Sequence, residues 1–176
     1  MPSATELKTY DDADAYAVYA ALMSRDYHPP AKKLIVEQET VNPIDPRLCL
    51  LDDKAFRKEY SEAIEDYYER WKDQYRLARQ LKTEIDYSLV ARQDLSEFFK
   101  KDAGGWDAFY KRYPDSSGIF SVSVVGFNRS KTQAILYVSH TYGYQGAWGS
   151  LRALYKLRGN WIPDPNFNIA GCGSSS

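Results

Sequence analysis

Residues 118–162 read GIFSVSVVGFNRSKTQAILYVSHTYGYQGAWGSLRALYKLRGNWI and contain three apolar runs separated by turn residues. In the first run, serines alternate with Phe120, Val122 and Val124, which is the two-residue period of a strand with one buried face. A turn at residues 128–132 leads into a second strand, and an Arg-Gly-Asn turn follows the third. The stretch therefore predicts three consecutive antiparallel strands, a β-meander.

The chain ahead of these strands predicts helices. From Asp53 to Leu81, apolar and aromatic residues recur on one face of a helix, and charges of both signs occupy the other face. We therefore expect one long amphipathic helix that packs on the sheet. The residues on its apolar face are Phe56, Tyr60, Ala63, Ile64, Tyr67, Trp71 and Tyr75.

Shorter elements are expected before this helix. Either Asp11 or Asp12 can accept hydrogen bonds from the first amides of a helix over residues 12–24. Residues 34–41 form a β-branched run that predicts a strand. The prolines in residues 42–53 exclude regular structure there.

The segment between the long helix and the meander is less regular. Residues 82–90 predict either a short strand or an extended linker. Asp94 and Glu97 have the spacing of a capping box and predict a helix start. A glycine pair then precedes a second short helix, which Pro114 ends.

The order of these elements indicates an α+β fold, in which N-terminal helices pack on an antiparallel sheet with a C-terminal three-stranded meander. The 176 residues fit one domain. We expect a single domain over residues 11–165, a flexible N-terminus over residues 1–10 and a flexible tail over residues 166–176.

The composition is that of a soluble globular protein, with 44% hydrophobic and 27% charged residues and a net charge of −1. Basic residues are concentrated after Lys111 and acidic residues before it, which favours charge pairing within the molecule. Nucleic acid is not an expected partner, because strand alternation explains the basic and aromatic residues of the last hairpin as a solvated basic face over an apolar one. These residues are Arg152, Tyr155, Lys156, Arg158 and Trp161.

Neither a metal nor another cofactor is expected. The chain has two cysteines, Cys49 and Cys172, and two histidines, His28 and His140, and a zinc site needs a closer set of ligands. The two cysteines are compatible with one disulfide or with two free thiols.

The sequence shows no membrane span and no signal peptide. No stretch approaches the ~20 consecutive apolar residues that cross a bilayer. The first residues lack the basic and apolar regions of a secretory signal.

Four short motifs of the second half resemble a family of uncharacterised bacterial proteins, many of which look like exported or envelope proteins. The similarity covers residues 16–161 and is greatest after Trp106. The motifs are Tyr-Pro-x-Ser-x-Gly at Tyr113–Gly118, Val-Gly-Phe-Asn at Val125–Asn128, Gln-Ala-x-x-Tyr-Val at Gln133–Val138 and Gly-x-Trp at Gly159–Trp161.

This resemblance implies the strand pattern and a periplasmic or secreted location, but no activity. In that family the loop after the Tyr-Val strand commonly carries two cysteines. Here the corresponding residues, 142–150, read YGYQGAWGS and contain none. The thiol chemistry of the family's loop is therefore not expected in this chain.

The glycine- and aromatic-rich loop at residues 142–149 is the candidate binding site. Its aromatic side chains either fold back over the sheet edge or stay exposed and contact a protein or a small uncharged ligand. The candidate binding residues are His140, Tyr142, Tyr144, Gln145 and Trp148.

Catalytic motifs are weak. Ser123 and Ser139 lack the flanking pattern of a nucleophile elbow, and the loop glycines lead into a strand where a phosphate site requires a helix. The preferred hypothesis is a non-catalytic accessory or binding domain of the envelope or of secreted proteins. The alternative is a small enzyme with an aromatic-lined pocket in which His140 acts as acid or base; a carboxylate beside His140 would favour it. The oligomeric state does not follow from the sequence.

Overall fold

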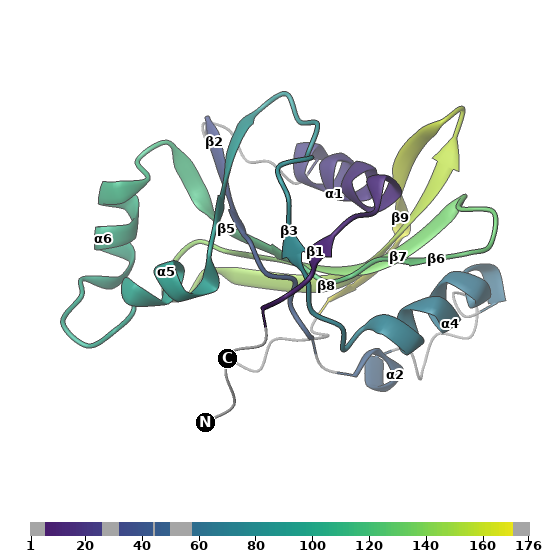
Figure 1. Ribbon diagram of the computed structural model, residues 1–176, viewed down its shortest axis with the longest axis horizontal. Helices are drawn as coiled ribbons and strands as arrows, with labels where there is room; N and C mark the ends of the chain where they lie inside the picture. The colour runs from purple at the N-terminus through teal and green to yellow at the C-terminus, as the bar shows by residue number, and fades with distance from the viewer. Residues whose placement is uncertain (1–5, 26–31, 44, 50–57, 171–176) are drawn as a thin grey trace.

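The computed structural model describes residues 6–25, 32–43, 45–49 and 58–170 (Figure 1). The helices of this part are α1 (Ala13–Arg25), α2 (Pro46–Cys49), α4 (Ser61–Arg70), α5 (Arg92–Glu97) and α6 (Gly105–Arg112). Two short strands, β1 (Thr9–Tyr10) and β3 (Arg76–Leu77), pair in parallel. The other described strands are β2 (Lys33–Glu37), β4 (Asp86–Val90), β5 (Ser116–Val122), β6 (Gly126–Phe127), β7 (Gln133–Thr141), β8 (Ala147–Leu157) and β9 (Asn160–Ala170).

In the described chain these longer strands form one seven-stranded sheet, in the order β4-β2-β5-β7-β8-β9 with β6 beside β7. The α+β class and the C-terminal three-stranded meander are confirmed: β5 and β6 form its first strand and pair antiparallel with β7, and β7 pairs antiparallel with β8. Strand β9 continues the antiparallel pairing beyond β8. The sheet as a whole is mixed, because β2 runs parallel to both β4 and β5. Parallel neighbours need long crossover connections, and the segments between β2, β4 and β5 provide them.

The helices cover the sheet at three places. Figure 1 shows α1 on one side of strands β7–β9 and α4 on the other side, while α5 and α6 lie at the parallel end. The main core lies between α1, α4 and the sheet, and it includes Tyr19, Tyr67 and Phe120. A smaller apolar cluster under α5 and α6 consists of Ile35, Val90, Leu95, Trp106 and Phe109.

The long helix predicted from Asp53 to Leu81 is wrong in its C-terminal third. Its apolar face is buried where the helix exists, at Ala63, Ile64 and Tyr67, but α4 ends at Arg70. Tyr75 is held in extended backbone, because its N–H donates to Thr40 Oγ1 and its carbonyl accepts the Thr40 N–H, both at 2.9 Å. Strand pairing therefore overrides helical periodicity after Trp71. Phe56 lies outside the described residues.

Three smaller boundaries also differ from the predictions. The predicted strand over residues 34–41 ends at Glu37. Helix α5 begins at Arg92 without a side-chain cap, so Asp94 lies inside its first turn. The proline-rich segment contains the one-turn helix α2, which starts at Pro46, a position where the missing N–H of proline is not needed. By contrast, the capping by Asp12 is confirmed, since its Oδ1 accepts the amide of Asp14 at 3.0 Å.

Both predicted flexible ends contain structure. Tyr10 in β1 is buried, and β9 continues to Ala170. Residues 166–170 stay in the sheet because Phe167 is fully buried, with its ring centroid 5.5 Å from that of Tyr60. The Tyr60 hydroxyl also donates to Asp164 Oδ2 at 2.6 Å. Cys172 and the side chain of Cys49 lie outside the described residues.

The first strand of the meander is interrupted between β5 and β6, and Ser123 fills the break. Its carbonyl accepts the hydroxyl of Tyr19 in α1 at 2.7 Å. Its Oγ accepts the hydroxyl of Tyr67 in α4 at 3.2 Å and the backbone N–H of Tyr137 in β7 at 2.8 Å. One buried serine therefore connects both helices to the sheet.

We predict that Gly126→Ala destabilises the protein by about 1–3 kcal/mol, because overpacking forces backbone or side chains to move. A Cβ at this position would lie 2.5 Å from the Ala63 carbonyl oxygen and 2.6 Å from the Tyr67 backbone nitrogen. The matched control is Gly143→Ala, whose Cβ meets only Gly146 N at 4.0 Å. Urea unfolding measures both variants, and equal midpoints would contradict the close packing of α4 on β6.

We also predict a loss of stability at alkaline pH. Burial raises the pKa of Tyr10 to about 12 from an ordinary value of 10.0, although the hydrogen bond from the Val125 N–H opposes this shift. A raised tyrosine pKa means that the neutral form is favoured in the folded state, so its contribution is complete below pH 10 and is lost as pH rises towards 12. When the folded state binds one proton more than the unfolded state, the free energy of unfolding falls by about 1.4 kcal/mol per pH unit. The loss over this interval is therefore about 3 kcal/mol.

The measurement is the free energy of unfolding as a function of pH, compared between the wild type and Tyr10→Phe. The variant should show a smaller alkaline decline, since phenylalanine cannot ionise. An identical pH dependence of the two proteins would count against this role of Tyr10.

Candidate binding site at the aromatic loop

The loop between β7 and β8 is a compact turn. The Tyr142 N–H donates to the Gly146 carbonyl at 2.8 Å, and the Gly146 N–H donates to the Gly143 carbonyl at 3.3 Å. Glycine at residue 146 leaves room for the Tyr142 ring, because a Cβ there would come within 2.3 Å of it. The turn therefore has the Tyr142 ring packed against its own backbone.

The five predicted binding residues differ in exposure. His140 is buried and Trp148 is half-buried, whereas Gln145 is exposed. Tyr142 is 46% exposed and Tyr144 is 78% exposed, the largest value among the large hydrophobic side chains of the described chain. The structure thus places the two tyrosines of the loop at the surface and the imidazole beneath them.

Helix α6 holds the loop from the other side. The Tyr110 hydroxyl donates to the Tyr142 carbonyl at 2.8 Å, and the Trp106 N–H donates to the Tyr144 hydroxyl at 3.4 Å. Tyr144 fits there only because residue 105 is glycine, where a Cβ would lie 2.0 Å from the tyrosine oxygen. The two elements are far apart in sequence, so the contact could not be read from local patterns.

These contacts build a continuous aromatic surface. The Phe99 and Trp106 ring centroids are 5.1 Å apart, and those of Trp106 and Tyr110 are 5.7 Å apart. Phe99 is itself 43% exposed, whereas Trp106, which contacts both rings, is buried. We define the aromatic surface by its four members, Phe99, Tyr110, Tyr142 and Tyr144.

A cavity of about 370 Å³ lies at this surface and is lined by Tyr110, Ser117, His140 and Tyr142. The His140 ring stacks on Phe120 with a centroid distance of 4.1 Å and an interplanar angle of 5°. The sequence analysis did not identify Tyr110 or Ser117 as site residues.

Ser117 reaches the cavity through a β-bulge. Lys33 pairs with Ser116 and Ile35 pairs with Ile119, so β5 has one extra residue relative to β2. Gly118 takes up this irregularity with φ of 119°. The Ser-Ser-Gly sequence could have indicated this bulge, since an isolated glycine in a strand pattern suggests one.

The bulge positions the imidazole. His140 Nε2 lies 2.7 Å from the Ser117 carbonyl oxygen, which can only accept, so Nε2 carries the proton. None of the four residues lining the cavity is a carboxylate. Ser123 is taken up by the hydrogen bonds at the β5–β6 break. The four residues that line the cavity therefore do not include the carboxylate that would favour the enzyme alternative.

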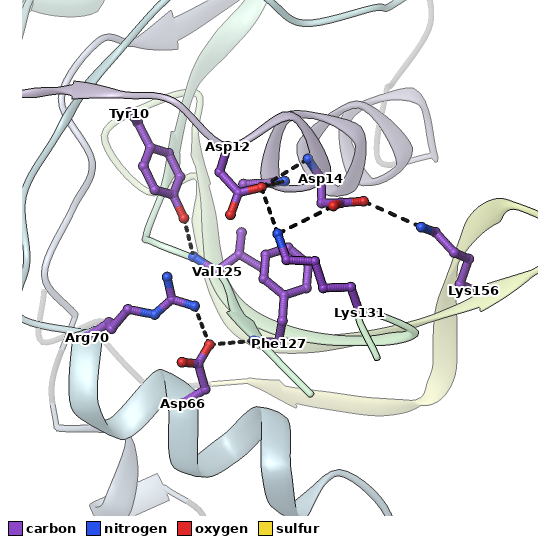
Figure 2. A network of polar contacts seen from close by, with 10 residues as sticks. Tyr10, Asp12, Asp14, Asp66, Arg70, Val125, Phe127, Lys131 and Lys156 are labelled. Carbon is purple, nitrogen blue, oxygen red and sulfur yellow. Dashed lines mark hydrogen bonds and ion pairs between the residues drawn. The ribbon is translucent and has the colours of Figure 1, made fainter. Parts of the chain in front are cut away.

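A second, charged cavity of about 470 Å³ lies between α4 and the β6–β7 turn. Figure 2 shows why its charges are engaged: Lys131 Nζ lies 3.5 Å from Asp12 Oδ1 and 3.4 Å from Asp14 Oδ2. Lys156 also pairs with Asp14, at 3.4 Å. Basic residues of the late strands thus pair with acids of α1 and its cap, which confirms the charge pairing expected from their distribution.

On the opposite side of the same turn, Asp66 of α4 forms an ion pair with Arg70 (Figure 2). Its Oδ2 also accepts the Phe127 N–H at 2.7 Å. These contacts fasten the β6–β7 turn to both helices, so Asp12, Asp66, Arg70 and Lys131 have a structural role in this cavity.

The described residues contain no group of three or more His, Cys, Asp or Glu side chains arranged to hold a metal ion. None of their helices combines the length and apolarity needed to cross a bilayer.

Comparisons of the chain with models of protein families, with curated proteins and with solved structures gave no match. The resemblance to exported bacterial proteins therefore stays a prediction from the sequence.

We predict that Gly118→Ala costs more stability than Gly159→Ala and disturbs the cavity. Both glycines have positive φ, 119° and 80°, so both substitutions strain the backbone, by about 1–2 kcal/mol. At Gly118, however, the Cβ would also lie 2.4 Å from the Thr141 carbonyl oxygen, whereas at Gly159 it meets nothing within 4 Å. Urea unfolding and the NMR signals of the His140 ring would test this. Equal losses of stability and an unchanged His140 signal would refute it.

Proposed function

We propose that this protein is a non-catalytic binding domain whose contact surface is the aromatic surface together with Gln145 and Trp148. The observation that carries the proposal is the exposure of Tyr144, which is 78% accessible although hydrogen-bonded to α6. A large side chain that folding leaves in water contributes little to the core, and contiguous exposed apolar groups mark interaction sites.

The surface is also preorganised. Tyr110 and Trp106 hold the loop from α6, and Gly146 allows Tyr142 to lie against the turn. Aromatic side chains that are already fixed lose little conformational entropy when a partner binds. This arrangement suits a rigid contact surface better than a flexible lid.

The proposed partner is a protein or a small uncharged ligand. The members of the aromatic surface offer ring faces and hydroxyl groups, and none is charged at neutral pH. Tyrosine and tryptophan in particular are enriched among residues that dominate binding energy. A periplasmic or secreted location, with an accessory role in the cell envelope, belongs to the same proposal and is supported by the strand motifs at residues 113–161.

The enzyme alternative has one supporting observation, the position of His140 in a cavity of about 370 Å³. It is the weaker proposal because Nε2 is committed to the Ser117 carbonyl and no lining residue is a carboxylate. If the protein turned over a substrate and a folded His140→Ala variant did not, the enzyme alternative would become the stronger proposal.

The binding proposal predicts that uncharged ligands found by an NMR screen perturb the amides of residues 142–148 and of α6. The screen uses uncharged organic fragments and neutral peptides. Tyr144→Ala and Trp148→Ala should each lower the affinity for these ligands by about tenfold or more, since truncating an anchor residue costs about 2 kcal/mol of binding free energy.

The matched control is Leu157→Ala, which removes another exposed hydrophobic side chain, 53% accessible, at the far end of β8. This variant should bind the ligands as the wild type does. If Tyr144→Ala and Trp148→Ala also bound every ligand with unchanged affinity, the proposed contact surface would have to be abandoned.

A further inference from the structure

We infer that the cavity lined by Tyr110, Ser117, His140 and Tyr142 binds one uncharged ring-shaped molecule bearing a hydroxyl group, as a sugar or a phenol does. The inference rests on the proposed function, because it names the ligand class of the same site. It adds a ligand residue, Ser117, that the aromatic surface alone does not include.

The size and walls of the cavity select for a small ring. Its volume of about 370 Å³ lies near the lower end of the roughly 300–1,000 Å³ that small-molecule sites occupy. Tyr110 and Tyr142 belong to different elements and both border this space. Aromatic faces pack favourably against flat apolar faces, including those of other rings.

The absence of charge excludes ionic ligands from this site. Among the described residues, those that line the cavity include no Lys, Arg, Asp or Glu. An ion that leaves water for such a site would lose hydration without gaining a counter-charge, which is strongly unfavourable. The ligand is therefore neutral.

The hydroxyl requirement comes from Ser117. Its Oγ is buried and has no hydrogen-bond partner within the described chain, although its backbone carbonyl accepts from His140. A buried hydroxyl without a partner is costly, and native structures rarely leave one unexplained. A ligand hydroxyl in the cavity would supply the missing partner.

The site is formed before any ligand arrives. The β-bulge at Gly118 fixes Ser117, and His140 is held between its hydrogen bond to that residue and the Phe120 ring. Tyr110 is fixed by its hydrogen bond to the Tyr142 carbonyl. Binding therefore requires only a rotation of the Ser117 side chain, which turns its buried Oγ towards the ligand hydroxyl.

The test is an NMR titration of the intact protein with four probes: methyl glucoside, phenol, toluene and benzoate. Toluene matches phenol but lacks the hydroxyl, and benzoate adds a negative charge. At least one of the two hydroxyl compounds should shift the amides of Ser117, His140 and Tyr142, and which one does so distinguishes a sugar from a phenol site. Toluene and benzoate should bind at least about tenfold more weakly, the loss expected for an unmade buried hydrogen bond.

Ser117→Ala should lower the affinity for the hydroxyl compound by about tenfold and leave that for toluene unchanged. Ser88→Ala, which removes a half-buried serine from the edge strand β4, is the control and should bind as the wild type does. Thermal unfolding confirms that both variants are folded.

Toluene binding as tightly as phenol, or Ser117→Ala leaving the affinity for the hydroxyl compound intact, would overturn the inference. So would the failure of both hydroxyl compounds to shift the cavity amides. These results would not affect the proposed function, which fails separately if ligands of the aromatic surface are insensitive to Tyr144→Ala.

Discussion

The fold depends on the hydrogen bonds that Ser123 makes at the break between β5 and β6. Here the regular pairing with β7 is interrupted, although the Ser123 N–H still donates to the Tyr137 carbonyl at 3.0 Å, and the Ser123 carbonyl and Oγ need other partners. Tyr19 from α1, Tyr67 from α4 and the Tyr137 N–H from β7 satisfy them. Because all these groups are buried, losing one contact leaves another polar atom unpaired, so the two helices and the sheet are held as one unit.

Tyrosine serves two opposite purposes in this chain. In the core, Tyr10, Tyr19 and Tyr67 bury their rings and use their hydroxyl groups to satisfy backbone or side-chain atoms. At the aromatic surface, Tyr142 and Tyr144 are fixed by hydrogen bonds and still face water. Position in the fold, and not residue type, separates a structural tyrosine from one that is available to a ligand.

The candidate site lies where the sheet changes character. Strand β5 is parallel to β2 on one side and antiparallel to β7 on the other. The bulge at Gly118 brings the Ser117 carbonyl to His140 of β7. This irregularity of β5 therefore places Ser117 in the lining of the cavity.

The sequence by itself determined the α+β class, the meander and the buried face of α4, because these follow from the spacing of apolar residues along one segment. It also located the aromatic loop and the end of β7 at His140. Only the tertiary structure decided that residues 75–77 leave the helix, since the partners of that backbone lie at Thr40 and in β1. Likewise, Tyr110 and Ser117 join the loop through contacts between segments more than twenty residues apart. Periodicity reports which side of a segment is apolar, but pairing between distant segments is decided by hydrogen bonds and packing that no single segment contains.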